Sequence, residues 1–133
     1  GKKVLIHSNK EKTKAGSRHY IHAQDVADGL MFILNLKNYS HKGDFGNAKC
    51  PKFNLVGPEE IDNLTLAQTI AKVQKKDLVY ELIDNHSSRP GHDLRYSLSP
   101  KLLKSLGWEP KIKLSKRIEE VVEWSLKNNR WLS

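Results

Sequence analysis

Amphipathic stretches with helical spacing alternate along this chain with short apolar segments, and this alternation restricts the fold more than any other feature. Apolar side chains recur every three or four positions over about residues 24–36, 64–74 and 115–128, which predicts three helices. Their inward faces are expected to consist of Val26, Leu30, Ile33, Leu34, Leu66, Ile70, Val73, Ile118, Val121, Val122 and Leu126.

Local signals mark where helices begin and end. Thr65 and Gln68 have the spacing of a capping box at the start of the second helix. Ser99 followed by Pro100 predicts a short further helix, with serine as the cap and proline at the first helical position. Gly107 is expected to end that helix in a left-handed conformation.

Short apolar segments at residues 4–6, 53–56 and 78–83 predict strands. The order of elements is then strand, helix, strand, helix, strand, helix, helix. We expect a small mixed α/β domain with short strands and about four helices, spanning residues 1–133 as one unit. So few short strands do not make a complete doubly wound nucleotide-binding sheet.

Length and composition exclude several classes of protein. The 133 residues are enough for one domain with a core. The longest apolar run, at residues 29–34, is too short to span a bilayer. The single cysteine, Cys50, excludes an internal disulfide, suits a reducing compartment and is expected to be a bystander. We therefore expect a cytoplasmic protein with no membrane partner.

The chain is basic, with a net charge of +8 from 23 basic and 15 acidic residues. Lysines supply most of this charge and are spread along the whole chain. Proteins that bind nucleic acid usually gather their basic residues into a stripe with interleaved aromatic side chains. We expect no nucleic-acid partner, whereas small polyanionic ligands such as phosphates remain compatible with the charge.

Several common catalytic and binding motifs are missing. No Gly-rich loop follows a predicted strand, which excludes a dinucleotide-binding fingerprint and a P-loop within this chain. His19 and His22 lack the second ligand pair that a metal site needs. Ser88, His92 and Asp93 lack a nucleophile elbow, so they are not interpreted as a hydrolase triad.

Residues 87–96 carry the densest chemistry in the chain. Arg89 and His92 flank Gly91, which permits a close approach of a ligand or of another backbone segment. The planar guanidinium group of arginine matches two phosphate oxygens at once. The alternative is an ion pair between Arg89 and Asp93 that fixes the turn, and the residues alone favour neither interpretation.

A second candidate stretch covers residues 17–28. Arg18 precedes a short aromatic segment and is the only arginine among the first 88 residues. Asp25 lies near the start of the first predicted helix, where its charge complements the helix dipole.

Five segments together resemble one family. The matching segments are 18–25, 53–57 with the following Asn63 and Leu64, the Arg-Pro-Gly-His-Asp-Leu-Arg-Tyr sequence at 89–96, the Leu-Gly-Trp pattern within 101–108, and 120–124. They resemble the C-terminal portion of nucleoside-diphosphate-sugar 4,6-dehydratases of the dTDP-glucose type, in the extended short-chain dehydrogenase/reductase superfamily. The Arg-Pro-Gly-His-Asp motif favours the 4,6-dehydratases within that superfamily.

The resemblance implies a substrate-binding domain of a larger NAD-dependent lyase. In such enzymes the N-terminal domain binds NAD and carries a Tyr-x-x-x-Lys pair, and no tyrosine of this chain has a lysine four residues later. The implied partners are a nucleoside-diphosphate sugar and that N-terminal domain, and the chain alone is expected to be inactive and monomeric. An exposed apolar patch is expected where the missing domain packs.

The resemblance also assigns roles to individual residues. Arg18 and Arg89 match the arginines that bind the pyrophosphate. Asn63 matches a substrate-binding asparagine, and His92 matches the histidine beside the nucleotide. No catalytic residue, cofactor-binding residue or metal ligand is implied within this chain.

Four further residues of the matching segments receive structural expectations. Asp93 is expected to orient Arg95 or the loop backbone. Tyr96 is compatible with packing on the ligand or in the core, while Trp108 and Trp124 are expected in the core.

The sequence departs from the family pattern at two places. The connection at residues 35–52 is longer than expected, and the sequence 56–58 has one glycine where the family often has two.

A nucleotide-sugar 4-epimerase of the same superfamily is the first alternative function. The second is a stand-alone basic binding module.

Overall fold

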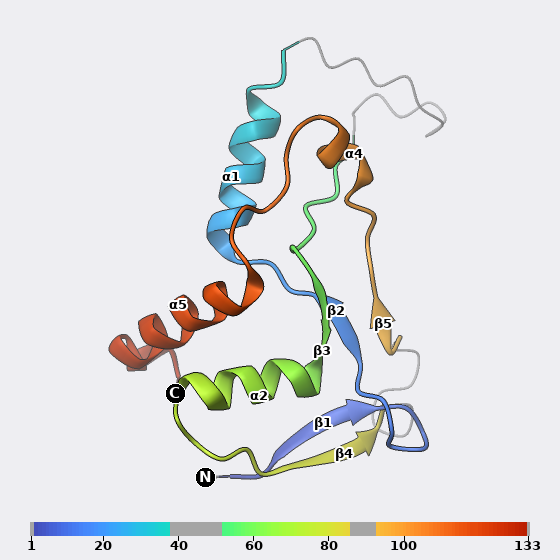
Figure 1. The fold of residues 1–133 in the computed structure, drawn as a ribbon, viewed down its shortest axis with the longest axis vertical. Coiled ribbons are helices and arrows are strands. Elements are labelled where there is room, and N and C mark those ends of the chain that lie inside the picture. The colour runs from blue at the N-terminus through green and yellow to red at the C-terminus, as the bar shows by residue number, and fades with distance from the viewer. Residues whose placement is uncertain (1, 38–51, 86–92, 133) are drawn as a thin grey trace.

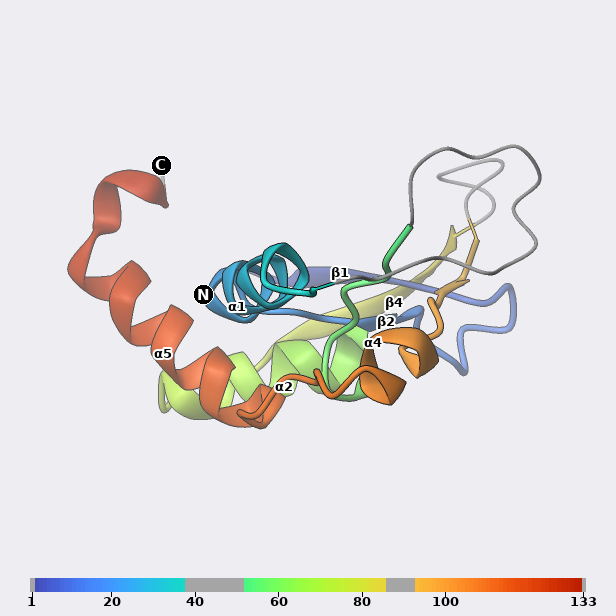
Figure 2. The same ribbon diagram turned by 90° about the horizontal axis from the view of Figure 1, so that it is seen from above.

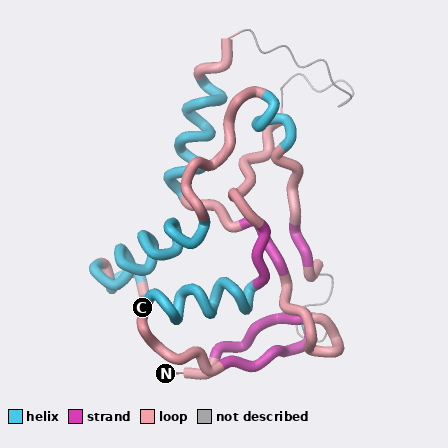
Figure 3. The backbone as a smooth tube through the Cα atoms, in the orientation of Figure 1, coloured by secondary structure: helices cyan, strands magenta, loops and turns pink. Residues whose placement is uncertain are grey.

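The computed structural model describes residues 2–37, 52–85 and 93–132, and the strands among them form two separate small sheets (Figures 1 and 3). In the first sheet β1 (Val4–Ser8) pairs in parallel with β4 (Tyr80–Asp84), with Ile6 opposite Leu82. These strands confirm the predictions at residues 4–6 and 78–83, with shifts of one or two residues at their ends.

The second sheet has three very short strands in the order β3-β2-β5. The central strand β2 (Ser17–His19) pairs antiparallel with β3 (Glu60–Asp62) and parallel with β5 (Arg95–Tyr96). None of the three was predicted. They bring Arg18 and Tyr96 opposite one another in register.

The strand predicted at 53–56 is wrong, because residues 52–58 join no ladder among the described residues. This segment is nevertheless partly buried. Val56 is in the core, and Leu55 packs against Gly29 of the first helix. Its apolar side chains therefore fill the space between that helix and β2 without strand pairing.

The predicted helices are all present, with small shifts at their ends. The described helices are α1 (Ala23–Leu34), α2 (Asn63–Val73), α4 (Lys101–Ser105), α5 (Leu114–Lys127) and the short 3₁₀ helix η1 (Asn129–Trp131). Gly107 has a φ of +100°, which confirms the predicted end of α4. The predicted start is wrong by one residue, because Pro100 stands at the N-cap position and Lys101 is the first helical residue, although Ser99 does accept a hydrogen bond from the Lys101 amide at 3.4 Å.

The capping box at Thr65 and Gln68 is wrong. The side chain of Asp62 caps α2 instead, accepting from the amides of Leu64 and Thr65 at 2.9 Å each. Thr65 lies inside the helix and its hydroxyl donates to the other carboxylate oxygen of Asp62. The cap therefore comes from the last residue of β3, so that strand and helix join without a linker.

The main apolar core lies between α2 and α5, and Figure 2 shows α5 crossing one end of α2. Leu114, Ile118 and Val122 of α5 are buried there. The partly buried residues packed on them are Tyr20, Ile61, Leu66, Ile70 and Val73. The sequence thus identified the inward face of α2 and the first half of the inward face of α5.

Several residues expected in the core are exposed instead. Val121, Leu126 and Trp124 of α5 are about half exposed, because α2 covers only one side of α5. On α1, Leu34 is 77% exposed and Leu30 is half exposed. Trp108 does pack under α1, against Gly29.

Charged side chains join α1 to α5. Arg117 of α5 donates from Nε to Asp25 Oδ2 of α1 at 3.1 Å and from Nη2 to the other carboxylate oxygen. Nη1 donates to Gln24 and Glu120. Asp25 was expected to act as a helix-dipole charge, and the structure shows it buried in this ion pair.

Candidate functional site

Arg18 and Asn63 are the two predicted site residues within the described part of the chain, whereas Arg89 and His92 lie outside it. Arg18 is in the middle of β2 and Asn63 begins α2, directly after β3. Because β2 and β3 are neighbours, the sheet holds these two residues close together. Their placement therefore depends on a ladder that the sequence did not predict.

The guanidinium group of Arg18 is fixed by three backbone carbonyls. Nη1 donates to the carbonyls of Ser17 at 2.6 Å and Leu94 at 2.9 Å, and Nη2 donates to that of Asp93 at 3.3 Å. The ring of Tyr96 covers the group, with Cζ of Arg18 at 4.2 Å from the ring centroid. All these partners except Ser17 belong to the segment that follows residues 86–92.

Asn63 is held near Arg18 by hydrogen bonds with Tyr20 and Gly16. The Tyr20 hydroxyl donates to Asn63 Oδ1, and the Asn63 amide donates to the Gly16 carbonyl at 2.8 Å. Burial raises the pKa of the Tyr20 phenol above its usual value, so this hydroxyl stays a neutral donor at pH 7. A side chain at position 16 would meet the Leu94 carbonyl at 2.9 Å. The missing side chain of Gly16 therefore lets the Leu94 carbonyl come close enough to accept from Arg18.

Next to Arg18 lies a cavity of about 310 Å³. Arg18 and Tyr96 supply a cationic and an aromatic wall, and Leu55 and Val56 supply apolar surface. Such a mixture suits a ligand with a charged group at one end and a flat or apolar group at the other. Asn63 does not line this cavity, so the structure brings it near Arg18 without placing it on the cavity wall.

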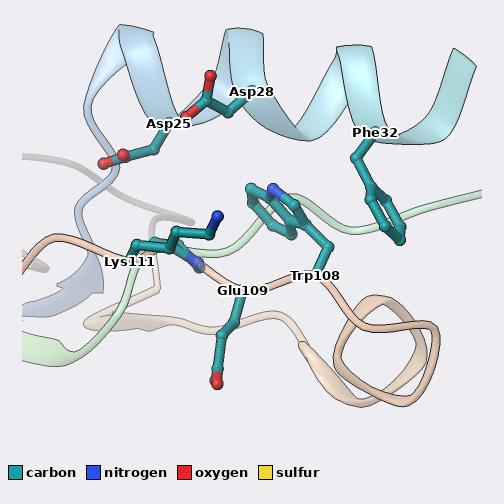
Figure 4. Close-up of a pocket in the computed structure, with 7 residues that line it drawn as sticks. Asp25, Asp28, Phe32, Trp108, Glu109 and Lys111 are labelled. Carbon is teal, nitrogen blue, oxygen red and sulfur yellow. The ribbon is translucent and has the colours of Figure 1, made fainter. Parts of the chain in front are cut away.

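A second cavity, of about 270 Å³, lies beneath α1 (Figure 4). Asp25 and Asp28 of α1 lie on one side, with Trp108 and Lys111 on the other, and the carboxylate of Glu109 points away from the helix. Two carboxylates repel an anion, and that of Asp25 is already paired with Arg117. Charge therefore favours the cavity beside Arg18 for a phosphate-bearing ligand.

Arg95 is held by Glu60 and not by Asp93. Its Nε and Nη2 donate to the two carboxylate oxygens of Glu60 at 2.7 Å each, and Ser17 Oγ donates to one of them at 2.6 Å. Asp93 takes part through its backbone, where its carbonyl accepts from Arg18. The expectation that Asp93 orients Arg95 is therefore wrong, while its alternative, the backbone of the loop, concerns residues 86–92 outside the described part of the chain. Glu60 is the residue that sequence reasoning missed.

This network predicts a response to acid. The hydrogen bonds from Arg95 and Ser17 lower the pKa of Glu60 from 4.5 to about 2. Because the pKa is lower in the folded chain, the stabilisation is complete above about pH 4.5 and is lost as the pH falls towards 2. We expect the amide NMR signals of Ser17 and Arg95 to titrate below pH 4.5, and this step to be absent in Glu60→Gln. A midpoint for Glu60 near its ordinary value would contradict the prediction.

The described residues contain neither a candidate metal site nor a membrane-spanning helix. Among the described residues, no three His, Cys, Asp or Glu side chains are grouped so that they could hold a metal ion. None of the helices that the structure describes is long and apolar enough to cross a bilayer.

Comparisons with known proteins identify relatives over most of the chain. No protein-family model matches it. It is 34% identical over 121 residues to dTDP-glucose 4,6-dehydratase 1 of Escherichia coli (strain K12), an alignment that covers 86% of this chain and 31% of that enzyme. It is 29% identical over 115 residues to dTDP-D-glucose 4,6-dehydratase of Mus musculus, covering 84% of this chain and 30% of that enzyme. The chain thus spans about a third of the length of these relatives.

A solved structure has the same fold. The chain superposes on dTDP-glucose 4,6-dehydratase from Bacillus anthracis str. Ames, solved in complex with NAD, with a TM-score of 0.69 and 24% sequence identity. The match covers 98% of this chain and 37% of that one. The mixed α/β architecture with short strands expected from the sequence is therefore confirmed as part of an extended short-chain dehydrogenase/reductase fold.

Proposed function

We propose that this chain, a relative of one portion of the dTDP-glucose 4,6-dehydratases, is the nucleotide-sugar-binding domain of an NAD-dependent nucleotide-sugar 4,6-dehydratase. The parent enzyme would be a lyase. It would take hydride from C4 of the sugar, eliminate water across C5 and C6, and return hydride to C6. The names of the relatives support the dehydratase over the 4-epimerase and over a stand-alone basic module.

The fixed guanidinium group of Arg18 beside the cavity carries this proposal. A nucleotide sugar has a diphosphate with about two negative charges, and arginine binds phosphate oxygens through charge-assisted hydrogen bonds. The cavity places this cation next to Leu55, Val56 and the Tyr96 ring, which suits the less polar parts of the ligand. Arg89 and His92, outside the described residues, are proposed as further ligands of the same molecule.

NAD does not fit the residues of this chain. The sequence has no Gly-rich loop after a strand and no Tyr-x-x-x-Lys pair, which are the groups that would hold and use this cofactor. We therefore propose that NAD is bound by the other portion of the parent enzyme, which lies N-terminal to this one. This chain then contributes substrate binding and no catalytic residue, and the enzyme is proposed to be cytoplasmic.

Helix α1 carries exposed apolar side chains, which are expected where that other portion packs. Leu30, Met31 and Leu34 of α1 are all more than half exposed. Exposed apolar side chains gathered on one helix mark a surface that another protein segment covers. Their exposure supports the proposal that α1 faces the NAD-binding domain.

Replacing Arg18 with alanine is expected to weaken binding of dTDP-glucose by about thirty- to a thousandfold. A charge-assisted contact in a partly buried site contributes on the order of 2–4 kcal/mol, which corresponds to that range. The measurement is isothermal titration calorimetry of the purified chain with dTDP-glucose. Arg18→Lys keeps the charge without the planar group, and its affinity for dTDP-glucose is expected to lie between those of Arg18→Ala and the unmodified chain.

The matched control is Arg130→Ala, which removes another exposed arginine, on η1. It is expected to leave the affinity unchanged. Equal binding by Arg18→Ala and the unmodified chain would contradict the proposed function. A chain that binds dTDP-glucose no better than dTMP would contradict the role assigned to the diphosphate.

A further inference from the structure

Tyr96 lies against Arg18 without being part of the core. The two residues are opposite one another in the parallel pairing of β2 and β5. The Tyr96 ring is 45% exposed, and its face is 4.2 Å from Cζ of the guanidinium group. An aromatic face at this distance attracts a cation and restricts the plane in which it lies. Because the ring is this exposed, packing in the core is not its main role.

The hydrogen bonds of Arg18 decide which of its donors are left for a ligand. A guanidinium group has five N–H donors. Both N–H bonds of Nη1 and one of Nη2 are used by the carbonyls of Ser17, Leu94 and Asp93. Within the described part of the chain, Nε–H and the second N–H of Nη2 have no acceptor. In any guanidinium group Nε–H and the neighbouring N–H of Nη2 are parallel, and such an edge can bind two oxygens of one phosphate.

Tyr96 is itself anchored to the turn that holds Arg18. Its hydroxyl accepts a hydrogen bond from the Asp93 amide at 3.3 Å, and the Asp93 carbonyl accepts one from Arg18. The ring, the turn and the guanidinium group therefore form a closed set of contacts. If the ring is removed, the carbonyls still hold one edge of the guanidinium group, but its plane becomes free to tilt.

We propose that Tyr96 is a positioning residue, which holds the guanidinium plane of Arg18 so that the two N–H bonds without an acceptor among the described residues face a phosphate group of the ligand. This role rests on the proposed function for the identity of the ligand. It does not require Tyr96 to touch the nucleotide sugar. The aromatic face performs the task, so phenylalanine at this position should replace tyrosine.

The first test needs no ligand. In the NMR spectrum of the ¹⁵N-labelled chain, the ring current of Tyr96 is expected to shift the Arg18 Nε–H resonance upfield. This shift is retained in Tyr96→Phe and lost in Tyr96→Leu. An Arg18 resonance that is the same in Tyr96→Leu as in the unmodified chain would overturn the stacking. The other amide resonances report in the same spectra that each variant is folded.

The second test separates positioning from a general effect on structure. Tyr96→Leu is expected to weaken binding of dTDP by about two- to thirtyfold, the range of a cation–π contact, while Tyr96→Phe stays within about twofold. In the Arg18→Ala background, Tyr96→Leu is expected to have no further effect, because Tyr96 acts through Arg18. Tyr80→Leu, at an exposed tyrosine of β4, is the matched control.

The results distinguish the two proposals. If the unmodified chain binds no dTDP, the proposed function and this role of Tyr96 are overturned together. If it binds dTDP and Tyr96→Leu binds equally well, only the role of Tyr96 is overturned. Additive losses in the double variant would also overturn it, because they would show that Tyr96 acts independently of Arg18.

Discussion

Replacing Arg117 with alanine is expected to lower the free energy of unfolding by about 3–5 kcal/mol, because the change leaves a buried carboxylate without its partner. Arg117 is 6% exposed and Asp25 is 2% exposed. Two parallel hydrogen bonds join them, and Arg117 also donates to Gln24 and Glu120. The measurement is urea denaturation at pH 7 followed by circular dichroism.

Two controls make this prediction specific. Lys116→Ala removes the neighbouring residue, whose ion pair with Glu119 is exposed, and is expected to leave the free energy of unfolding essentially unchanged. Replacing both Asp25 and Arg117 with leucine is expected to destabilise less than either single change, because apolar groups replace the whole buried pair. If Arg117→Ala and Lys116→Ala cost the same, the ion pair does not hold α1 to α5.

This pair shows which part of the fold the sequence could predict. The helices α1, α2 and α5 follow from apolar spacing, which is a property of each segment alone. Arg117 lies beside Ile118 on α5, and nothing in that segment indicates that the guanidinium group is buried. Its burial depends on how the start of α1 approaches α5, and that approach involves a contact between residues more than 90 positions apart.

The second sheet escaped prediction for a different reason. β2, β3 and β5 have only two or three residues each, which is too short for alternating hydrophobicity to be visible. Polar contacts hold them together, chiefly Glu60 with Arg95 and Ser17. A search for opposite charges would not have paired Glu60 with Arg95, since 35 residues separate them.

The members of the candidate site were proposed from the sequence, whereas its geometry was not. Arg18 and Asn63 were singled out because they match a family pattern, and as binding residues they stay predictions, like Arg89 and His92. The hydrogen bond from Tyr20 to Asn63 and the stacking of Tyr96 on Arg18 needed the structure. One local signal was available: Tyr20 is two residues after Arg18, which places both on the same side of an extended segment.

Replacing Gly57 with alanine is expected to cost about 3 kcal/mol of stability, the upper end of the usual range for overpacking, and to impair ligand binding. A Cβ atom at this position would lie 1.9 Å from the carbonyl oxygen of Tyr20 and 2.6 Å from its carbonyl carbon. Both are backbone atoms, so no side-chain rotation relieves the overlap, and the two segments must separate. Denaturation measured as for Arg117→Ala, together with calorimetry with dTDP-glucose, checks both parts.

Gly107→Ala provides the comparison. Gly107 has a φ of +100° with nothing within 4 Å of an added Cβ, so alanine there meets conformational strain of about 1–2 kcal/mol and no overlap. This variant is expected to melt earlier but to bind dTDP-glucose normally once folded. Comparing Gly107→Ala with Gly57→Ala therefore distinguishes a general loss of stability from a displacement of the binding residues.

The effect of Gly57→Ala on binding follows from the position of Tyr20 in the chain. Tyr20 lies directly between β2, which carries Arg18, and the start of α1. Pushing its backbone away from Gly57 moves its hydroxyl relative to Asn63 and shifts the end of β2. Normal affinity in a folded Gly57→Ala variant would show that the ligand does not depend on this arrangement. A loss of affinity larger than that of Gly107→Ala at equal folded fraction would show that the close approach of 52–58 to β2 sets the geometry of the site.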